Sequence, residues 1–322
     1  MRVGLFTALL AQDSLAQVIE KVQALGLQTV ELGTGNYPGD PHCKLEMLQN
    51  AGRLKEFQAR LNDAGIGISA LSCHGNPLHP DAGIRRGFIE TSRRTIRLAE
   101  KLGVKTVIDF SGCPGDSERA RKPNWVTCPW PPEYSELLRW QWEKKAVPFW
   151  KDHARFAADH GVRIAIEMHP GFVVYSPETM LRLRDAAGKA VGCNFDPSHL
   201  FWQRIDPIEA VRVLGEAGAL FHVHAKDTQI FESTCAARTG VLDSKPYADE
   251  IRRGWIFRTV GYGHGAEWWA HFISALRLAG YDDTLSIEHE DSLMSVNEGL
   301  QKAAQFLPAL VIREARPKMW WA

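Results

Sequence analysis

The hydrophobic positions of the chain fall into short runs that are separated by longer segments of helical period. Within the longer segments, such as 45–65 and 87–103, apolar residues recur three and four positions apart, which is typical of amphipathic helices. The short runs are rich in Val, Ile, Leu and Phe and are predicted to be strands. They are residues 3–7, 29–33, 67–75, 105–112, 163–169, 190–196, 220–227 and 284–290.

Glycines mark the ends of several predicted helices. Gly26, Gly65, Gly103 and Gly280 each stand shortly before the next predicted strand, where glycine suits a left-handed helix C-cap. The recurring order of strand, helix, glycine and strand indicates βαβ units and a parallel sheet. Eight units, with no G-x-G-x-x-G after the first strand, favour a closed (β/α)8 TIM barrel over an open dinucleotide-binding sheet. We expect one domain over residues 1–322.

Two connections are too long for simple barrel loops. Residues 112–133 are rich in Pro, Gly and Trp and follow the fourth predicted strand, and residues 228–258 follow the seventh. Both therefore leave the carboxyl ends of strands, where TIM barrels build their active sites. Long connections of this kind are typical of lids, binding loops or partner surfaces.

Composition removes several classes of function. The 322 residues carry 38 Lys and Arg against 38 Asp and Glu, so no net charge draws the chain toward nucleic acid or an anionic membrane. No apolar run is long enough to span a bilayer, and the first residues do not resemble a signal peptide. The six cysteines form no C-x-x-C pair, as expected of reduced thiols in a cytoplasmic protein.

Polar residues gather where the predicted strands end. Because the interior of a filled barrel ordinarily holds Val, Ile and Leu, acids and imidazoles there need a reason. Period-2 alternation puts Glu167 and His169 on one face and Glu288 and Glu290 on another, and turns His289 outward. Burying several carboxylates together is costly without a cation. The residues at these ends are His74, Asp109, Glu167, His169, Asp196, His199, His222, His224, Glu288 and Glu290.

A divalent metal would supply that cation. His222 and His224 lie two positions apart on one strand and point to the same side, so we expect one to be a ligand and the other to contact the ligands or the substrate. Carboxylates from separate strands together with one imidazole suit Mn²⁺ best, with Mg²⁺, Co²⁺ or Zn²⁺ as alternatives.

Four motifs, in order along the last four predicted strands, resemble the xylose-isomerase-like TIM-barrel superfamily. They are IAIEMHP, NFDPSH, HVHAKD and LSIEHED. The resemblance covers essentially the whole chain and extends to sugar phosphate isomerases and epimerases, ketose 3-epimerases and inosose dehydratases. It implies one metal held by Glu167, Asp196, His224 and Glu288. It also implies that His199 and His74 contact substrate, whereas His264 stands where many relatives have a glycine-rich turn.

The resemblance implies sugar isomerisation or epimerisation. Glu167 and Glu288 would remove and return a proton next to a carbonyl that the metal polarises, through an enediolate. His199 and Lys226 would stabilise the developing negative charge, with His222 nearby.

A second resemblance, to the large subunits of bacterial C-glycoside deglycosidases, gives an alternative. His169 shares a face with Glu167, which the 3-epimerases do not require. In this alternative His169 acts as the base and a 3-oxo-glycoside loses its aglycone by β-elimination. Those enzymes have a small second subunit, and the Trp-rich residues 124–142 would pack against that subunit or an aromatic aglycone.

Other classes fit less well. Endonuclease IV shares the barrel, but the neutral charge argues against a DNA-binding rim. A non-catalytic binding barrel would not need so many acids at its strand ends. Homo-oligomers are expected because surface tryptophans are costly to leave in water; the candidates are Trp140, Trp142, Trp320 and Trp321. No glycine-rich anion loop is evident, which favours a free or oxidised sugar over a phosphate ester.

Overall fold

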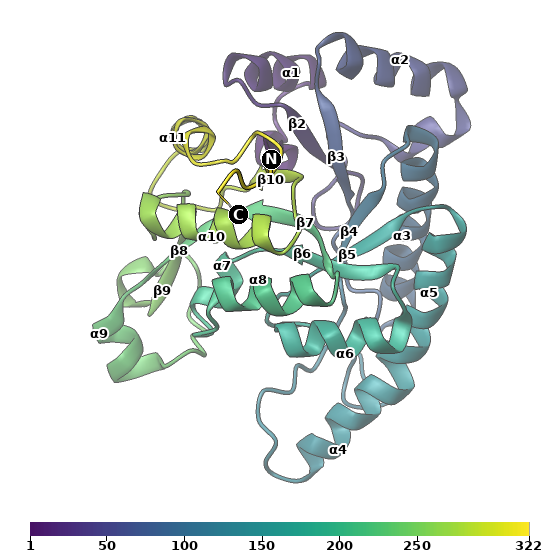
Figure 1. Cartoon of the computed structure of the whole chain (residues 1–322). Coiled ribbons are helices and arrows are strands. Elements are labelled where there is room, and N and C mark those ends of the chain that lie inside the picture. The colour runs from purple at the N-terminus through teal and green to yellow at the C-terminus, as the bar shows by residue number, and fades with distance from the viewer. Residues whose placement is uncertain (322) are drawn as a thin grey trace.

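In the computed structural model, which describes residues 1–321, eight parallel strands close into a barrel (Figure 1). Around the barrel the order is β1, β10, β7, β6, β5, β4, β3 and β2. This confirms the (β/α)8 prediction. The strands are β1 (Arg2–Phe6), β2 (Thr29–Gly33), β3 (Gly67–Ser72), β4 (Thr106–Phe110), β5 (Arg163–Glu167), β6 (Val191–Phe195), β7 (Leu220–Ala225) and β10 (Thr284–Ile287).

Helices surround the strands and bury their apolar faces against them (Figure 1). The longer ones are α1 (Leu15–Ala24), α2 (Ala51–Asp63), α3 (Ala82–Leu102), α4 (Glu133–Trp140), α5 (Val147–Asp159), α6 (Pro177–Ala187), α8 (Pro207–Glu216), α10 (Ala266–Leu278) and α11 (Val296–Phe306). Two short helices, α7 (Ser198–Phe201) and α9 (Glu232–Thr234), follow β6 and β8. The predicted glycine caps are confirmed: Gly26, Gly65, Gly103 and Gly280 all have positive φ, which costs glycine little.

The barrel interior is more polar than the hydrophobic pattern predicts. Alternation along β2 sends Val30 and Leu32 into the main hydrophobic core and turns Glu31 into the barrel. There Ser286 Oγ donates a hydrogen bond to Glu31 Oε2 at 2.9 Å. Lower in the barrel, the hydroxyls of Thr29 and Thr284 lie 3.2 Å apart. The interior is therefore held together by hydrogen bonds as well as by packing.

The first long connection runs from β4 to α4 and is irregular up to the start of that helix. The helix α4 then continues into α5 through a π-helical turn at Gln141–Ala146. Pro148 follows this turn at the start of α5; its missing N–H and its ring would disrupt a regular α-helix, and the wider turn accommodates them. Figure 1 shows α4 projecting away from the barrel.

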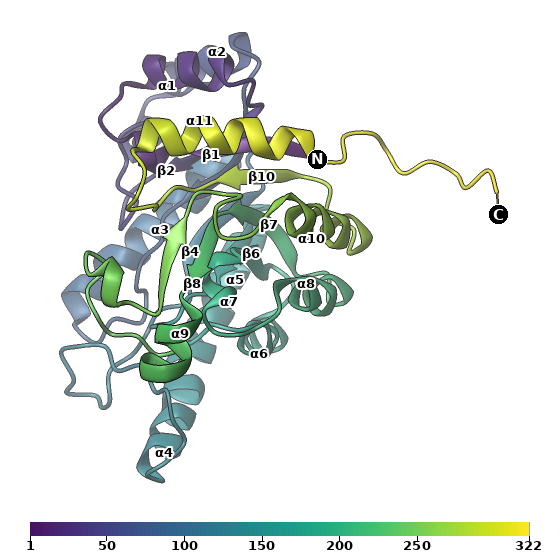
Figure 2. The ribbon, with the colours of Figure 1, turned by 90° about the vertical axis from the view of Figure 1, so that its left-hand side faces the viewer.

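The second long connection has secondary structure of its own, in addition to the strands that the sequence predicts. It contains an antiparallel hairpin formed by β8 (Asp227–Ile230) and β9 (Trp255–Arg258), with α9 between the two strands (Figure 2). Trp202, Trp255 and Phe257 form a small hydrophobic cluster of their own beside it. Cross-strand pairing and this cluster give the insertion an ordered core that strand-length patterns alone do not reveal.

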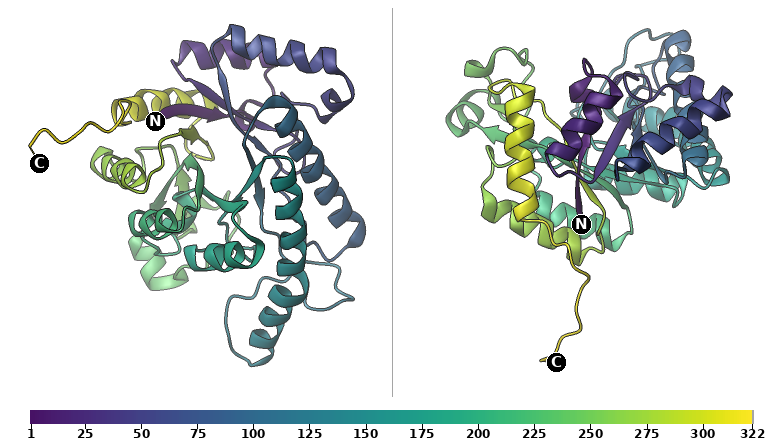
Figure 3. Two further views of the ribbon diagram at one scale, coloured as in Figure 1. Left: turned by 45° about the vertical axis from the view of Figure 1, so that its right-hand side comes forward. Right: turned by 90° about the horizontal axis from the view of Figure 1, so that it is seen from above.

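The predicted surface tryptophans differ in their exposure. Trp142 is only 1% exposed, and the guanidinium of Arg182 lies over its ring, so its placement on the surface was wrong. Trp320 and Trp321 are exposed on the C-terminal segment that extends from the body in Figure 3. All six cysteines are free thiols. Within residues 1–321, none of the helices combines the length and apolarity needed to cross a bilayer.

Candidate metal centre and active site

Four side chains meet at the carboxyl ends of consecutive strands of the barrel. Glu167 ends β5, Asp196 follows β6, His224 lies on β7 and Glu288 follows β10. One ligand atom from each lies within 4.8 Å of the others. The structure thus brings together the four residues that the sequence predicts as metal ligands.

Two acids of this group, Glu167 and Glu288, are held ionised despite their burial. Burial alone would raise the pKa of Glu167, but the imidazoles of His74, His199 and His224 hold that pKa well below its usual range. Burial likewise opposes ionisation of Glu288, and Lys226 and His224 lower its pKa. Both carboxylates therefore carry the negative charge that a cation ligand or a base needs.

The group fits a divalent cation. Asp196 Oδ2 and Glu288 Oε2 are buried and accept no well-directed hydrogen bond, although Lys226 Nζ lies 3.0 Å from each. Buried oxygens normally have a directed partner, so these two have lone pairs available for another ligand. Three carboxylates and one imidazole form a donor set that suits Mn²⁺, Mg²⁺, Co²⁺ or Zn²⁺.

His224 is oriented by a carboxylate that the sequence analysis missed. Its Nε2 donates to Glu31 Oε2 at 2.9 Å, and its Nδ1 lies 2.9 Å from Glu288 Oε2 and 3.3 Å from Glu167 Oε2. Nδ1 is thus the nitrogen that faces the other three ligands. A carboxylate that accepts the second ring N–H of a metal-bound histidine fixes its tautomer and raises its basicity.

Glu31 is completely buried, and both of its carboxylate oxygens accept hydrogen bonds. Ser72 and Ser286 each donate a hydrogen bond to one of its two oxygens. Burial alone would raise the pKa of Glu31, but the neighbouring His224 outweighs this effect and lowers that pKa. The signal was present in the sequence, since Glu31 is a lone acid in the otherwise apolar run 29–33. It lies within the strand and not at its end, which is why an inventory of strand ends passes over it.

Replacing Glu31 by glutamine should weaken metal binding by about 10–100-fold, the usual cost of losing a partner of a metal-bound histidine. Glutamine preserves the shape but removes the negative charge that strengthens Nδ1 as a ligand. Metal titration of the apo-protein measures the change. Glu298→Gln, an exposed acid paired with Lys302, is the control. Unchanged affinity in Glu31→Gln would contradict the orienting role.

His222 lies below the predicted ligands, inside the barrel. Its Nδ1 donates to Asn194 Oδ1 at 3.0 Å, and its Nε2 lies 3.3 Å from Ser69 Oγ. Asn194, which the sequence analysis did not single out, donates in turn to Glu167 Oε2 at 2.9 Å. His222 therefore reaches the four-residue group through Asn194, and its predicted contact with substrate stays a prediction.

The two histidines predicted to contact substrate each hold one oxygen of Glu167. His74 Nε2 donates to Oε2 at 3.0 Å and His199 Nε2 donates to Oε1 at 3.2 Å. His74 also packs against the ring of Phe110, with the ring centroids 4.6 Å apart. Glu167 is therefore fixed from two sides.

Lys226 lies among three acids. Its Nζ is 3.0 Å from Asp196, Glu288 and Glu290, which together outweigh burial and raise its pKa well above its usual value. The lysine is thus a fixed positive charge beside the ligand group. Glu288 and Glu290 reach the same lysine, which confirms that they share a face.

His169 stands beside His199, with the ring centroids 4.2 Å apart. Burial and the neighbouring His199 lower the pKa of His169 to about 3, so the ring is neutral at ordinary pH. Its Nδ1 donates to the carbonyl of Pro170 at 2.6 Å, which leaves Nε2 as the basic nitrogen. The ring is held in one neutral tautomer, and its lowered pKa makes Nε2 a weak base in this state.

Two neighbouring cavities open onto these residues. One, of about 360 Å³, is lined by Glu167 and Glu288 together with His74, Phe6, Phe110, Tyr37 and Glu290. The other, of about 440 Å³, is lined by His169, Tyr247, Ile256, Phe257, Glu290 and Ser292. Glu290 lines both, so the two cavities meet. Small-molecule sites are concave pockets of this size with a few convergent polar groups.

Comparison with known proteins agrees with this geometry. The model of the xylose isomerase-like TIM barrel family matches residues 19–310. The chain belongs to this family. It is 38% identical over 311 residues to the uncharacterized protein YfiH of Bacillus subtilis (strain 168), an alignment that covers 95% of this chain and 98% of that protein.

Several solved structures share this barrel, although their sequences differ widely from that of this chain. They include the IolI protein with a zinc atom (20% identity, TM-score 0.65, covering 97% of this chain and 98% of that one). A D-tagatose 3-epimerase-like protein has 19% identity and a TM-score of 0.64, with 96% and 98% covered. The 3-keto-D-glucoside 4-epimerase YcjR of E. coli has 13% identity and a TM-score of 0.62, with 96% and 99% covered. At these identities the likeness shows the fold alone.

The remaining predicted strand-end residues lie outside the ligand group of this xylose isomerase-like barrel. Asp109 faces away from it and accepts hydrogen bonds from the backbone of Gly75 and Phe110; burial raises its pKa to about 7. His289 turns outward, as predicted, and its Nδ1 lies 3.3 Å from Thr259 Oγ1. His264 Nδ1 donates to Asp227 Oδ1 at 2.7 Å. His264 therefore holds the glycine-rich turn and does not contact the ligand group.

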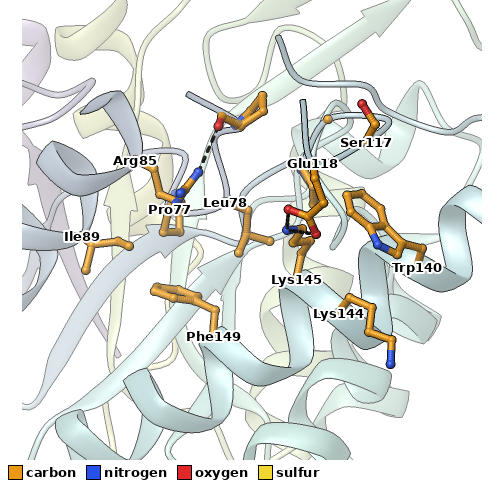
Figure 4. Close-up of a pocket in the computed structure, with 13 residues that line it drawn as sticks. Pro77, Leu78, Arg85, Ile89, Ser117, Glu118, Trp140, Lys144, Lys145 and Phe149 are labelled. Carbon is orange, nitrogen blue, oxygen red and sulfur yellow. Dashed lines mark hydrogen bonds and ion pairs between the residues drawn. The ribbon is translucent and has the colours of Figure 1, made fainter. Parts of the chain in front are cut away.

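A further cavity of about 260 Å³ lies apart from the site, between the start of α3 and the helices α4 and α5 (Figure 4). Its polar groups are largely satisfied within the chain. Arg85 donates to the carbonyls of His79 and Pro80, and Lys145 pairs with Glu118 at 2.7 Å. Figure 4 shows the hydrogen bond of Arg85 to Pro80 and the Lys145–Glu118 pair. The cavity therefore offers no set of converging acids or imidazoles that compares with the strand-end group.

Proposed function

We propose that this chain is a divalent-metal-dependent sugar isomerase or epimerase. The observation that supports it most directly is that Glu167 and Glu288 belong to one candidate ligand group and line one cavity. A bound divalent cation, with Mn²⁺ as our first choice, would polarise a sugar carbonyl and acidify the neighbouring C–H. The solved structures of an epimerase-like protein and of IolI with zinc support the proposal by analogy.

The protein residues have separate tasks in this reaction. Glu167 and Glu288 are ionised before the reaction, so either can remove the proton next to the carbonyl. The carboxylic acid that forms can give this proton back, and protonation from the opposite face requires the other carboxylate first to take a proton from solvent. Lys226 places a fixed positive charge where negative charge develops on the sugar oxygens. His74 and His199 keep the carboxylate of Glu167 in one orientation while it acts.

A second candidate function rests on His169. Its Nδ1 is bound to a carbonyl, its Nε2 is the basic nitrogen, and the ring lines the cavity beside the ligand group. This arrangement supports β-elimination from a 3-oxo-glycoside, with His169 taking the proton next to the oxo group. A small second subunit would then complete the enzyme. Trp130, which is 72% exposed in the connection before α4, is the residue we propose for that contact.

One experiment separates the two functions. The metal-loaded protein is incubated in D₂O with a panel of keto-sugars and 3-oxo-glycosides, and the products are followed by NMR. Deuterium at the carbon next to the carbonyl supports the isomerase or epimerase, and release of the aglycone supports the lyase. If no sugar exchanges a proton and no aglycone is released, both proposals fail.

Metal removal gives an independent check. EDTA should abolish activity, and Mn²⁺, Co²⁺ or Mg²⁺ should restore it, because in the proposed reaction the cation polarises the sugar carbonyl and acidifies the neighbouring C–H. Activity before and after dialysis, with metal content measured alongside, tests this. Full activity in the stripped protein would contradict the metal-dependent mechanism.

A further inference from the structure

The insertion between β7 and α10 presents an aromatic wall to the active site. Tyr247, Ile256 and Phe257 line the cavity of about 440 Å³ together with His169, and Glu290 and Ser292 supply its polar edge. The ring of Tyr247 stacks on that of Phe257, with the centroids 5.8 Å apart and the planes at 27°. Tyr247 nevertheless remains 58% exposed. The structure thus holds an aromatic ring against this cavity with its surface largely open to solvent.

The wall begins directly beside the ligand group. The ring of Phe257 lies under Lys226 Nζ at 4.8 Å and meets the ring of His199 edge-on at 5.4 Å. Lys226 and His199 in turn lie 3.0 and 3.2 Å from Asp196 Oδ2. A molecule that lies over Glu167 and Glu288 would therefore extend naturally onto Phe257 and Tyr247.

The wall is held rigidly. Trp255 packs edge-on against Phe257 at 5.1 Å and stacks on Trp202 at 4.6 Å with planes 6° apart. The buried Arg253 lies under the rings of Tyr247 and Trp255, and its Nε donates to the carbonyl of Trp255 at 3.1 Å. A preorganised wall loses little side-chain entropy when a ligand binds.

The volumes of the two cavities also favour a substrate larger than one sugar ring. The cavity over Glu167 and Glu288 and the aromatic cavity each reach the lower part of the range of about 300–1,000 Å³ that is usual for small-molecule sites. One sugar ring would occupy the first and leave the second empty. Two joined cavities of this size, one polar and charged and one aromatic, match a substrate with two rings.

We propose that the substrate is a glycoside whose reacting sugar carries a ring ketone, with that sugar over Glu167 and Glu288 and the substituent ring packed against Tyr247 beside Phe257. The substituent presents a flat apolar face, which either an aromatic ring or the C–H face of a second sugar can supply. This inference rests on the proposed function, since it assigns the reacting sugar to the same ligand group.

Binding constants of matched sugars test the inference. Calorimetric titration of the metal-loaded protein compares D-glucose and D-galactose with their phenyl β-glycosides and with cellobiose and lactose. We expect at least one glycoside to bind about tenfold more tightly than its free sugar, as one aromatic stacking contact provides. Preference for the phenyl glycosides would identify an aromatic substituent, and preference for the disaccharides a second sugar.

Three variants assign the preference to the wall. Tyr247→Ala should remove it, whereas Tyr247→Phe, which retains the ring, should preserve it. Ile251→Ala is the matched control, because Ile251 is on the same insertion, is 95% exposed and does not line the cavity. Thermal unfolding of each variant shows that the insertion stays folded.

The outcomes separate this inference from the proposed function. Equal binding of free sugars and glycosides, or a preference that survives in Tyr247→Ala, would overturn the inference. Failure of every glycoside to bind would overturn it as well. The proposed function falls only if no sugar exchanges its proton in D₂O, so either idea can fail while the other stands.

Discussion

Replacing Glu167 by glutamine should lower turnover by about 10²–10⁴-fold, the range usual for loss of a positioned acid or base. The change should also weaken metal binding, since the same carboxylate is a predicted ligand. Glutamine keeps the shape of the side chain but can neither accept the proton nor offer a charged oxygen. Steady-state kinetics at saturating metal measures the loss in turnover, and metal titration measures the loss in affinity.

A buried acid at another strand end gives the control for Glu167→Gln. Asp109 is the penultimate residue of β4, but it faces the backbone of Gly75 and Phe110 and not the ligand group. Asp109→Asn preserves the two acceptor contacts and should leave turnover close to that of the wild type. Near wild-type turnover in Glu167→Gln would overturn the central assignment of the site.

Replacing His224 by alanine should empty the metal site at neutral pH, because it removes the one imidazole of the ligand group. No neighbouring side chain can take over that bond without leaving its own partners. His222→Ala should retain the metal, since His222 contacts Asn194 and Ser69, and losing such an indirect partner costs about 10–100-fold in affinity or activity. Metal content of both purified variants measures the difference.

The structure makes the opposite result equally informative. Glu31, His222 and His224 form a second set of close ligand atoms just below the first. If His222→Ala loses the metal while His224→Ala keeps it, the predicted ligand set is wrong, and His222 and not His224 supplies the imidazole. Circular dichroism of both variants shows that the barrel remains folded.

The sequence alone was sufficient for the barrel and for the polar residues at its strand ends. The choice of Glu167, Asp196, His224 and Glu288 among them rests on the family resemblance, and the structure brings these four together. Hydrophobic runs of strand length, helical periods between them and glycines at Gly26, Gly65, Gly103 and Gly280 are local features, and local features decide strands, helices and caps. In a parallel barrel all strands end at the same rim. An acid or imidazole at the end of one strand, such as Glu167 or Asp196, is therefore placed near the others by topology alone.

Only the tertiary structure decided which side chains hold the ligands in place. Glu31 on β2 reaches His224 on β7, a strand far away in the sequence, and Asn194 on β6 reaches Glu167 on the neighbouring β5. No periodic pattern encodes such a contact, because it depends on the register of neighbouring strands, including the irregularity between Cys193 and Asn194. The same holds for the aromatic wall. Tyr247 and Phe257 come from an insertion without a strand or helix period of its own, and its folding back over β7 brings them to the site.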